Sequence, residues 1–119
     1  MDPTLPAYAT LDLTREGRLL TLAFNRPEAL NAFDLAMHDE FPEALDFAAA
    51  DEGSDVIVLT GCGRAFSAGG DLAHILDSAD HPEKFDHEIA MARRIVETLI
   101  GIEKPVVCAL NGHAVGLGA

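Results

Sequence analysis

Apolar and polar residues alternate in two neighbouring stretches near the start of the chain. Residues 11–14 and 19–24 each follow this pattern, and the polar sequence Arg-Glu-Gly at 15–17 separates them. Alternation with a period of two is typical of a strand that buries one face, and a short interruption containing glycine suits a tight turn. The pattern therefore predicts a β-hairpin formed by these stretches. Pro27 ends it, because proline has no N–H to donate to a sheet.

Two later segments carry apolar residues at helical spacing. The first has them at Phe33, Met37, Phe41, Leu45 and Ala48. The second has them at Phe85, Ile89, Ala92, Val96 and Leu99. The spacing predicts one helix from residue 33 to about 50, kinked near Pro42, and another that stops before Pro105.

Two continuous apolar runs, each followed by a glycine-rich loop, complete the pattern. Residues 55–61 (DVIVLTG) lead into 64–71 (RAFSAGGD), and residues 105–112 (PVVCALNG) lead into 113–119 (HAVGLGA). Such runs are typical of strands covered on both faces in a parallel sheet. Parallel strands joined by a helix end at the same edge of the sheet, which is where ligands bind in open α/β folds.

The order of these elements predicts an α/β or mixed α+β layered fold, with residues 1–119 in a single domain. Two small-residue loops at one sheet edge would present backbone N–H groups from two directions, as is needed to hold an oxyanion. No stop signal follows the glycine-rich C-terminal end, so we expect the chain to be an interrupted portion of a longer fold.

Composition and charge narrow the classes of protein that fit. The chain has 119 residues, 49% of them hydrophobic, which is enough for a packed core. A formal net charge of -12 argues against nucleic acid or an anionic membrane as the main partner. The chain has neither an apolar stretch of the roughly 20 residues that span a bilayer nor a signal-peptide pattern, so we expect a cytoplasmic protein without membrane association. Cys62 and Cys108 form no paired motif, which predicts free thiols and no metal site.

Known nucleotide-binding motifs do not explain the glycine loops. A P-loop is excluded because no Gly-Lys pair occurs in the chain, and the dinucleotide motif fails at Phe66, where it needs glycine. The sequence AFSAG at 65–69 is similar to a nucleophile elbow, which would make Ser67 the nucleophile of a serine hydrolase, with His113 and Asp71 as partners. Ser67 lies about six residues beyond the predicted strand, however, so we interpret it as a loop residue bonded to its own backbone. Tight turns alone remain the simplest alternative for each loop.

Three motifs in the chain resemble a known family. NRPEALNAF at 25–33, DVIVLTGCGRAFSAGGDL at 55–72 and KPVVCALNGHAVGLGA at 104–119 are similar, in order and separation, to the enoyl-CoA hydratase/isomerase family of the crotonase superfamily. The resemblance implies a crotonase-like fold of repeated ββα units, of which this chain would be the truncated N-terminal portion. It also implies an acyl-CoA thioester substrate in fatty-acid metabolism, a homotrimer or homohexamer, and no cofactor other than the coenzyme A of the substrate.

The resemblance also implies roles for particular residues. In the family, two backbone N–H groups bind the thioester oxygen and stabilise an enolate, and by motif position they belong here to Gly70 and Leu117. The resemblance places coenzyme A along Arg26, Ala29, Leu30, Arg64, Ala65, Phe66 and Ala68. The two arginines would supply positive potential for its phosphates, although a salt bridge or a solvated surface charge explains each equally well. We interpret Asp71 as the cap of a helix that begins at Leu72, and His113 as a loop residue.

The residues do not decide which reaction the site performs. In hydratases of this family two glutamates activate water, and the first would fall immediately after Ala119. Hydration or isomerisation of an enoyl-CoA is the leading hypothesis. Decarboxylation, thioester hydrolysis and a non-catalytic CoA-binding or assembly module are the alternatives. We also expect residues 1–119 alone to be inactive and prone to aggregate, because strand edges and apolar faces would be uncovered.

Overall fold

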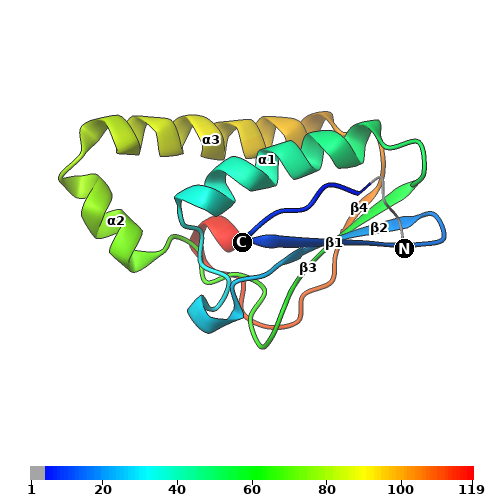
Figure 1. The fold of residues 1–119 in the computed structure, drawn as a ribbon, viewed down its shortest axis with the longest axis horizontal. Helices are drawn as coiled ribbons and strands as arrows, with labels where there is room; N and C mark the ends of the chain where they lie inside the picture. Colours follow the sequence, from blue (N-terminus) through cyan, green and yellow to red (C-terminus); the bar gives the residue numbers. More distant parts are fainter. Residues whose placement is uncertain (1–4) are drawn as a thin grey trace.

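The computed structural model describes residues 5–119, except for the side chains of Ala73, His74 and Ser78. Within this range, one mixed sheet has the strand order β1–β2–β3–β4 (Figure 1). Strands β1 (Leu11–Glu16) and β2 (Leu19–Phe24) pair antiparallel as a hairpin. Strand β3 (Val56–Gly61) runs parallel to β2, and β4 (Val106–Cys108) runs parallel to β3. The predicted hairpin and the mixed α+β fold class are confirmed, and β1 extends two residues beyond its predicted end.

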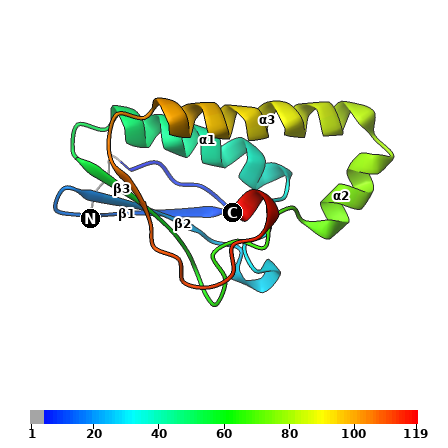
Figure 2. The same ribbon diagram turned by 180° about the vertical axis from the view of Figure 1, so that it is seen from behind.

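The helices lie mainly on one face of this sheet, as Figures 1 and 2 show. Helix α1 (Leu35–Ala50) packs against α3 (Pro82–Gly101), and α2 (Leu72–Ala79) links the loop after β3 to α3. Two short 3-10 turns, η1 (Pro27–Ala29) and η2 (Gly116–Gly118), complete the described elements. Helix α1 begins two residues later than predicted, because the Asp34 carboxylate accepts a hydrogen bond from the Met37 N–H at 2.9 Å and so caps the helix.

Aromatic side chains fill the space between α1 and the sheet. The ring of Phe24, on β2, meets the rings of Phe33, Phe41 and Phe66 edge to face, with centroid separations of 5.0 to 5.3 Å. This geometry is favourable because the positive edge of one ring meets the negative face of the next. Phe33 and Phe66 come from the two segments that flank the predicted site. The hydrophobic core therefore also fixes the positions of these segments.

The burial of strands β3 and β4 differs from the sequence prediction. We expected both continuous apolar runs to be covered on two faces, but β3 buries only the alternating side chains of Ile57 and Leu59. Strand β4 is an edge strand, and the Val107 side chain is 51% exposed. The prediction of full coverage is wrong for this chain because helices cover only one face of the sheet in the described structure.

The apolar stripe predicted for the second helix also faces outward in part. Helix α3 spans the predicted segment, but its only buried side chain among the described residues is that of Ile95. Phe85, Ile89 and Val96 are each about half exposed. Helix periodicity identified the element correctly, whereas it did not identify the face that packs on the core.

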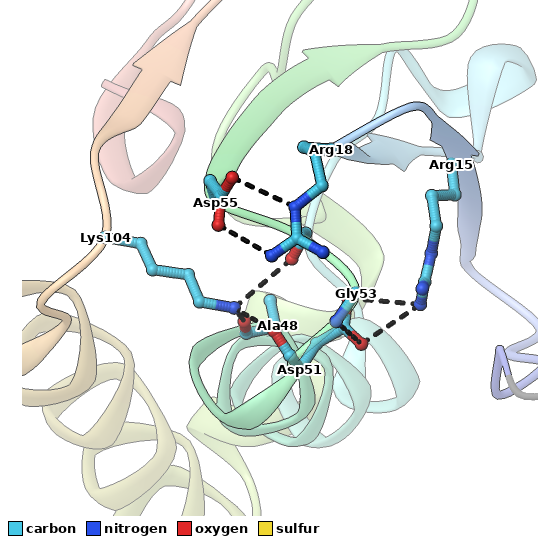
Figure 3. A network of polar contacts seen from close by, with 8 residues as sticks. Arg15, Arg18, Ala48, Asp51, Gly53, Asp55 and Lys104 are labelled. Atoms are coloured by element: carbon cyan, nitrogen blue, oxygen red, sulfur yellow. Dashed lines mark hydrogen bonds and ion pairs between the residues drawn. The ribbon is translucent and has the colours of Figure 1, made fainter.

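A polar network closes the end of the sheet opposite the glycine loops (Figure 3). The Lys104 ammonium donates to the carbonyl oxygens of Ala48, in the last turn of α1, and of Asp51, the residue that follows the helix. It also donates to Ser54 Oγ. Helix-terminal carbonyls lack helical partners and favour a nearby cation. Burial alone would raise the pKa of Asp51, but hydrogen bonds from Ser54 and Gly53, with the charges of Arg15 and Lys104, lower it below its usual range.

Candidate functional site

Three loop segments lie side by side beyond the carboxyl end of β3. Residues 65–71 lie between the segment that ends at Phe33 and the segment at 113–116, through isolated parallel bridges that join Phe33 to Gly70 and Ser67 to Ala114. Both ribbon views place η1, the loop after β3 and η2 at this same end of the sheet (Figures 1 and 2). The sequence prediction that the two glycine loops meet at one sheet edge agrees with this arrangement.

Asn31 holds the first two segments together. Its side chain is fully buried; Oδ1 accepts from the Arg26 N–H at 2.8 Å, and Nδ2 donates to the Cys62 and Ala65 carbonyls at 2.9 Å each. Its φ of 56° lies in the left-handed region, which asparagine tolerates better than most residues. No functional role for Asn31 follows from the sequence pattern. The only signal was an asparagine in a turn that follows proline, which is weak.

Ser67 is a structural residue of the central loop. Its side chain is fully buried, and its hydroxyl donates to the Asn31 carbonyl at 2.8 Å while accepting from the Gly69 N–H at 3.2 Å. Ser67 meets His113 through the backbone, since its N–H donates to the His113 carbonyl at 3.1 Å, and the His113 side chain is exposed. A nucleophile needs access to substrate and a base for its proton. This geometry argues against Ser67 as the nucleophile of a hydrolase and favours the loop interpretation.

The backbone around Gly70 directs the N–H of this residue away from the first segment. The Phe33 N–H donates to the Gly69 carbonyl at 2.6 Å, and the Asp71 N–H donates to the Phe33 carbonyl at 2.9 Å. In such parallel pairing the intervening residue, Gly70, points its own N–H to the opposite side. Gly69 has a φ of +92°, and a Cβ there would lie 2.7 Å from the Val115 carbonyl oxygen, so only glycine fits.

Leu117 presents its N–H at the start of a 3-10 turn. It is the second residue of η2. Two hydrogen bonds close this turn: the Gly118 N–H donates to the Val115 carbonyl, and the Ala119 N–H donates to the Gly116 carbonyl. N–H groups in the first turn of a helix have no partner within it. The turn packs closely on the central loop, because a Cβ at Gly118 would lie 2.5 Å from the Ser67 carbonyl oxygen.

Gly70 and Leu117 line one pocket of about 240 Å³. The rest of its lining comes from α1, α2, α3 and the residue bridged to Gly70, and comprises Phe33, His38, Ile75, Glu88, Ile89 and Ala92. The pocket wall is therefore largely apolar, with two ionisable side chains. An apolar wall strengthens the interaction of a backbone N–H with a charged oxygen.

The two arginines predicted to bind the phosphates of coenzyme A lie in different environments. Arg26 is only 18% exposed and pairs with Asp34 at 3.4 Å and with Asp71 at 3.2 Å. These contacts favour the salt-bridge explanation of Arg26 and give Asp71 a role in fixing the loop. Arg64 is exposed, and its side chain forms no ion pair with any residue in the range 5–119. Its charge is thus available to a ligand.

The other residues predicted to contact coenzyme A also fall into a buried group and an accessible group. Ala65 and Phe66 are buried, and the Ala65 carbonyl accepts from the side chains of Asn31 and Asn111. Their side chains serve the core rather than an outer surface. Ala29, Leu30 and Ala68 are partly exposed, and the Ala68 N–H donates to the Leu30 carbonyl at 3.0 Å. These three positions remain accessible to a ligand.

The fold and the paired loops define a mixed α/β protein with a largely apolar pocket beside the two glycine loops. Comparisons with known proteins identify its family. The family model described as enoyl-CoA hydratase/isomerase matches residues 14–119, so the chain belongs to this family. The chain is 37% identical over 106 residues to 1,2-epoxyphenylacetyl-CoA isomerase of Escherichia coli, covering 87% of this chain and 40% of that relative. It is 32% identical over 114 residues to crotonyl-CoA hydratase of Syntrophomonas wolfei, covering 94% of this chain and 43% of that relative.

A solved structure from the same family has a similar fold. The crystal structure of an enoyl-CoA hydratase/isomerase from Mycobacterium paratuberculosis matches with a TM-score of 0.88 and 33% identity, covering 97% of this chain and 45% of that chain. The predicted crotonase-like fold is thereby confirmed. The chain spans less than half the length of these relatives. A bilayer-spanning helix, which would need a long apolar stretch, is not found among the described residues.

Proposed function

We propose that this chain supplies the oxyanion-binding part of an acyl-CoA enzyme that hydrates or isomerises an enoyl-CoA. The observation that carries the proposal is the pocket that Gly70 and Leu117 line together. Their N–H groups come from two loops and, in this proposal, both donate to the thioester oxygen. The two relatives described above, an isomerase and a hydratase, are both named for CoA thioesters, which supports this substrate class.

The proposed chemistry follows from charge. Removal of a proton from the carbon next to a thioester moves negative charge onto the thioester oxygen. Two fixed N–H donors stabilise that charge without reorganising, and each contributes roughly 3 kcal/mol in comparable sites. The same enolate serves hydration, isomerisation and decarboxylation. The shared site thus accounts for the enolate, and the acid–base groups determine the reaction.

Coenzyme A is proposed to lie along Arg64, Ala68, Ala29 and Leu30, all of which are accessible. Replacing Arg64 with glutamate is expected to raise KM for an acyl-CoA about tenfold, since a charge-assisted hydrogen bond to phosphate is worth roughly 1.5 kcal/mol or more. The value of kcat should change little, because the contact is far from the reacting carbons. The matched control is Arg18→Glu, which removes another exposed arginine, paired with Asp55 at 2.7 Å at the opposite end of the sheet. An unchanged KM in Arg64→Glu would contradict this placement.

The proposed function as a whole is tested by proton exchange. The full-length protein is incubated in D₂O with butanoyl-CoA, which cannot be hydrated, and deuterium at the carbon next to the carbonyl is followed by NMR. We expect saturable exchange well above the uncatalysed rate. Binding of the thioester without exchange would instead favour the alternative, a non-catalytic CoA-binding or assembly module.

We further propose a cytoplasmic homotrimer or homohexamer that uses no cofactor other than the coenzyme A of its substrate. The exposed apolar side chains of α3 support an assembly in which a neighbouring subunit covers them, because proteins rarely leave large apolar patches exposed to water. Sedimentation of the full-length protein measures the assembly, and a monomer would contradict it.

A further inference from the structure

Arg26 joins two of the loop segments beside the pocket. Its Nη1 donates to the Ala32 carbonyl oxygen, its Nε pairs with Asp34 at 3.4 Å, and its Nη2 donates to the Asp71 carboxylate at 3.2 Å. The arginine side chain is only 18% exposed, so water competes weakly for these contacts. A planar guanidinium presents its donors in fixed directions, and all three nitrogens here meet protein acceptors. The contacts therefore leave the guanidinium little freedom to turn toward a ligand.

The contact with Ala32 begins a chain of hydrogen bonds that ends at Gly70. The Ala32 carbonyl and the Phe33 N–H belong to one peptide group, and this N–H donates to the Gly69 carbonyl oxygen at 2.6 Å. The Gly69 carbonyl and the Gly70 N–H belong to the next peptide group. Both peptide bonds are trans, so the C=O and the N–H of each group point in opposite directions. The Arg26 guanidinium thus lies at one end of two aligned peptide groups, and the Gly70 N–H lies at the other.

The order of groups in this chain suits an anion at its far end. A positive charge beside a peptide oxygen draws electron density toward that oxygen and leaves the N–H of the same group more positive. Hydrogen bonds in series polarise one another in this way, by roughly 10–30% per bond. Ala32 and Phe33 are buried, which shields the chain from water. The carboxylates of Asp34 and Asp71 lower the net charge of the cluster, but they also hold the guanidinium against the Ala32 carbonyl.

We propose that Arg26 is a positioning residue of the oxyanion site, which orients the Gly70 N–H and strengthens it as a donor through the two peptide groups. The proposal rests on the proposed function, because the acceptor at the end of the chain is the oxygen of an acyl-CoA thioester. It differs from a role in binding the phosphates of coenzyme A, which would act on the affinity for the substrate. A stronger donor acts instead on the charge that develops at the thioester oxygen.

The experiment reads the polarisation of the bound thioester directly. Butanoyl-CoA labelled with ¹³C at the carbonyl carbon is bound to the full-length protein, and infrared difference spectroscopy measures the carbonyl stretch, whose frequency falls as the hydrogen bonds to its oxygen strengthen. We expect this fall to be smaller in Arg26→Met. Exchange of butanoyl-CoA in D₂O should lose about 10-fold to 10²-fold in maximal rate, with little change in the concentration for half-maximal rate. Arg26→Lys restores the charge without the planar fork and should recover part of both signals.

Two comparisons separate this role from a general loss of structure. Arg18→Met makes the same change at an arginine whose side chain is 58% exposed and which pairs with Asp55 at the opposite end of the sheet, so it should change neither signal. Gly70→Pro removes the N–H at the end of the chain. In that background Arg26→Met should lower exchange by less than about twofold further, because two changes that act through one group are not additive.

Each outcome decides the role of Arg26. An unchanged frequency and exchange rate in Arg26→Met overturn the proposal while the proposed function stands. A raised half-maximal concentration with an unchanged maximal rate assigns Arg26 to substrate binding, and losses that multiply with Gly70→Pro place its effect elsewhere. If Arg26→Met fails to fold, as judged by circular dichroism, the uncharged polar variant Arg26→Gln decides by the same two signals. If the unchanged protein binds the thioester without exchange, the proposed function fails, and the infrared shift, which needs binding only, still decides.

Discussion

Replacing Gly70 with proline in the full-length protein is expected to lower kcat/KM for an acyl-CoA by about 10²-fold to 10³-fold, the loss seen when one oxyanion donor is removed. Proline lacks the N–H proposed to bind the thioester oxygen. The bridge to Phe33 is made by the Gly69 carbonyl and the Asp71 N–H, so it does not need the Gly70 N–H. The rate is measured from the absorbance of the enoyl thioester, and thermal unfolding checks the fold.

Gly70→Ala is the matched control, because alanine keeps the N–H. A Cβ at this position would lie 2.8 Å from Ile75 Cδ1, which is the end of a flexible side chain and can move aside. We expect this variant to retain most of the activity. Full activity in Gly70→Pro would show that the N–H of Gly70 does not stabilise the transition state, and would contradict the proposed role.

The elements that the sequence predicted well are those with a strong local pattern. Alternation located the hairpin to within two residues, and helical spacing located α1 and α3. Local pattern also suggested that the glycine loops meet, since parallel strands share an edge. The start of α1 was misplaced because Asp34, a polar residue inside the apolar spacing, decides the boundary through its cap.

The features that the sequence could not predict depend on contacts with residues far away along the chain. An apolar run shows that a strand can be covered, but not which neighbours cover it, so the burial of Val107 and of α3 was overestimated. Asn31 gives no periodic signal, and its importance comes from partners up to 36 positions away. Helical spacing also did not predict that His38 and Glu88 line the pocket with Gly70 and Leu117, because it does not indicate which turn of a helix will face a loop.

Replacing Asn31 with aspartate is expected to lower the free energy of unfolding by roughly 3 kcal/mol, because a buried polar network loses its donors. The Asn31 amide donates to the Cys62 and Ala65 carbonyls, both at 2.9 Å, whereas a carboxylate would place an oxygen against each carbonyl. Asparagine and aspartate both tolerate the left-handed backbone at this position, so the change tests the hydrogen bonds and not the turn. Denaturant-induced unfolding of the full-length protein measures the effect.

The matched control makes the same chemical change at an exposed site. Asn25→Asp, six positions earlier on the surface, is expected to change the free energy of unfolding by less than about 0.5 kcal/mol. A large loss in Asn31→Asp alone would show that the amide joins the turn after β2 to the loop after β3. Because Ser67 donates to the Asn31 carbonyl and Phe33 bridges to Gly70, displacement of this turn should also move the proposed oxyanion donor. Equal stability of the two variants would contradict a structural role for Asn31, and the loop geometry would then depend on the core packing of Phe33 and Phe66.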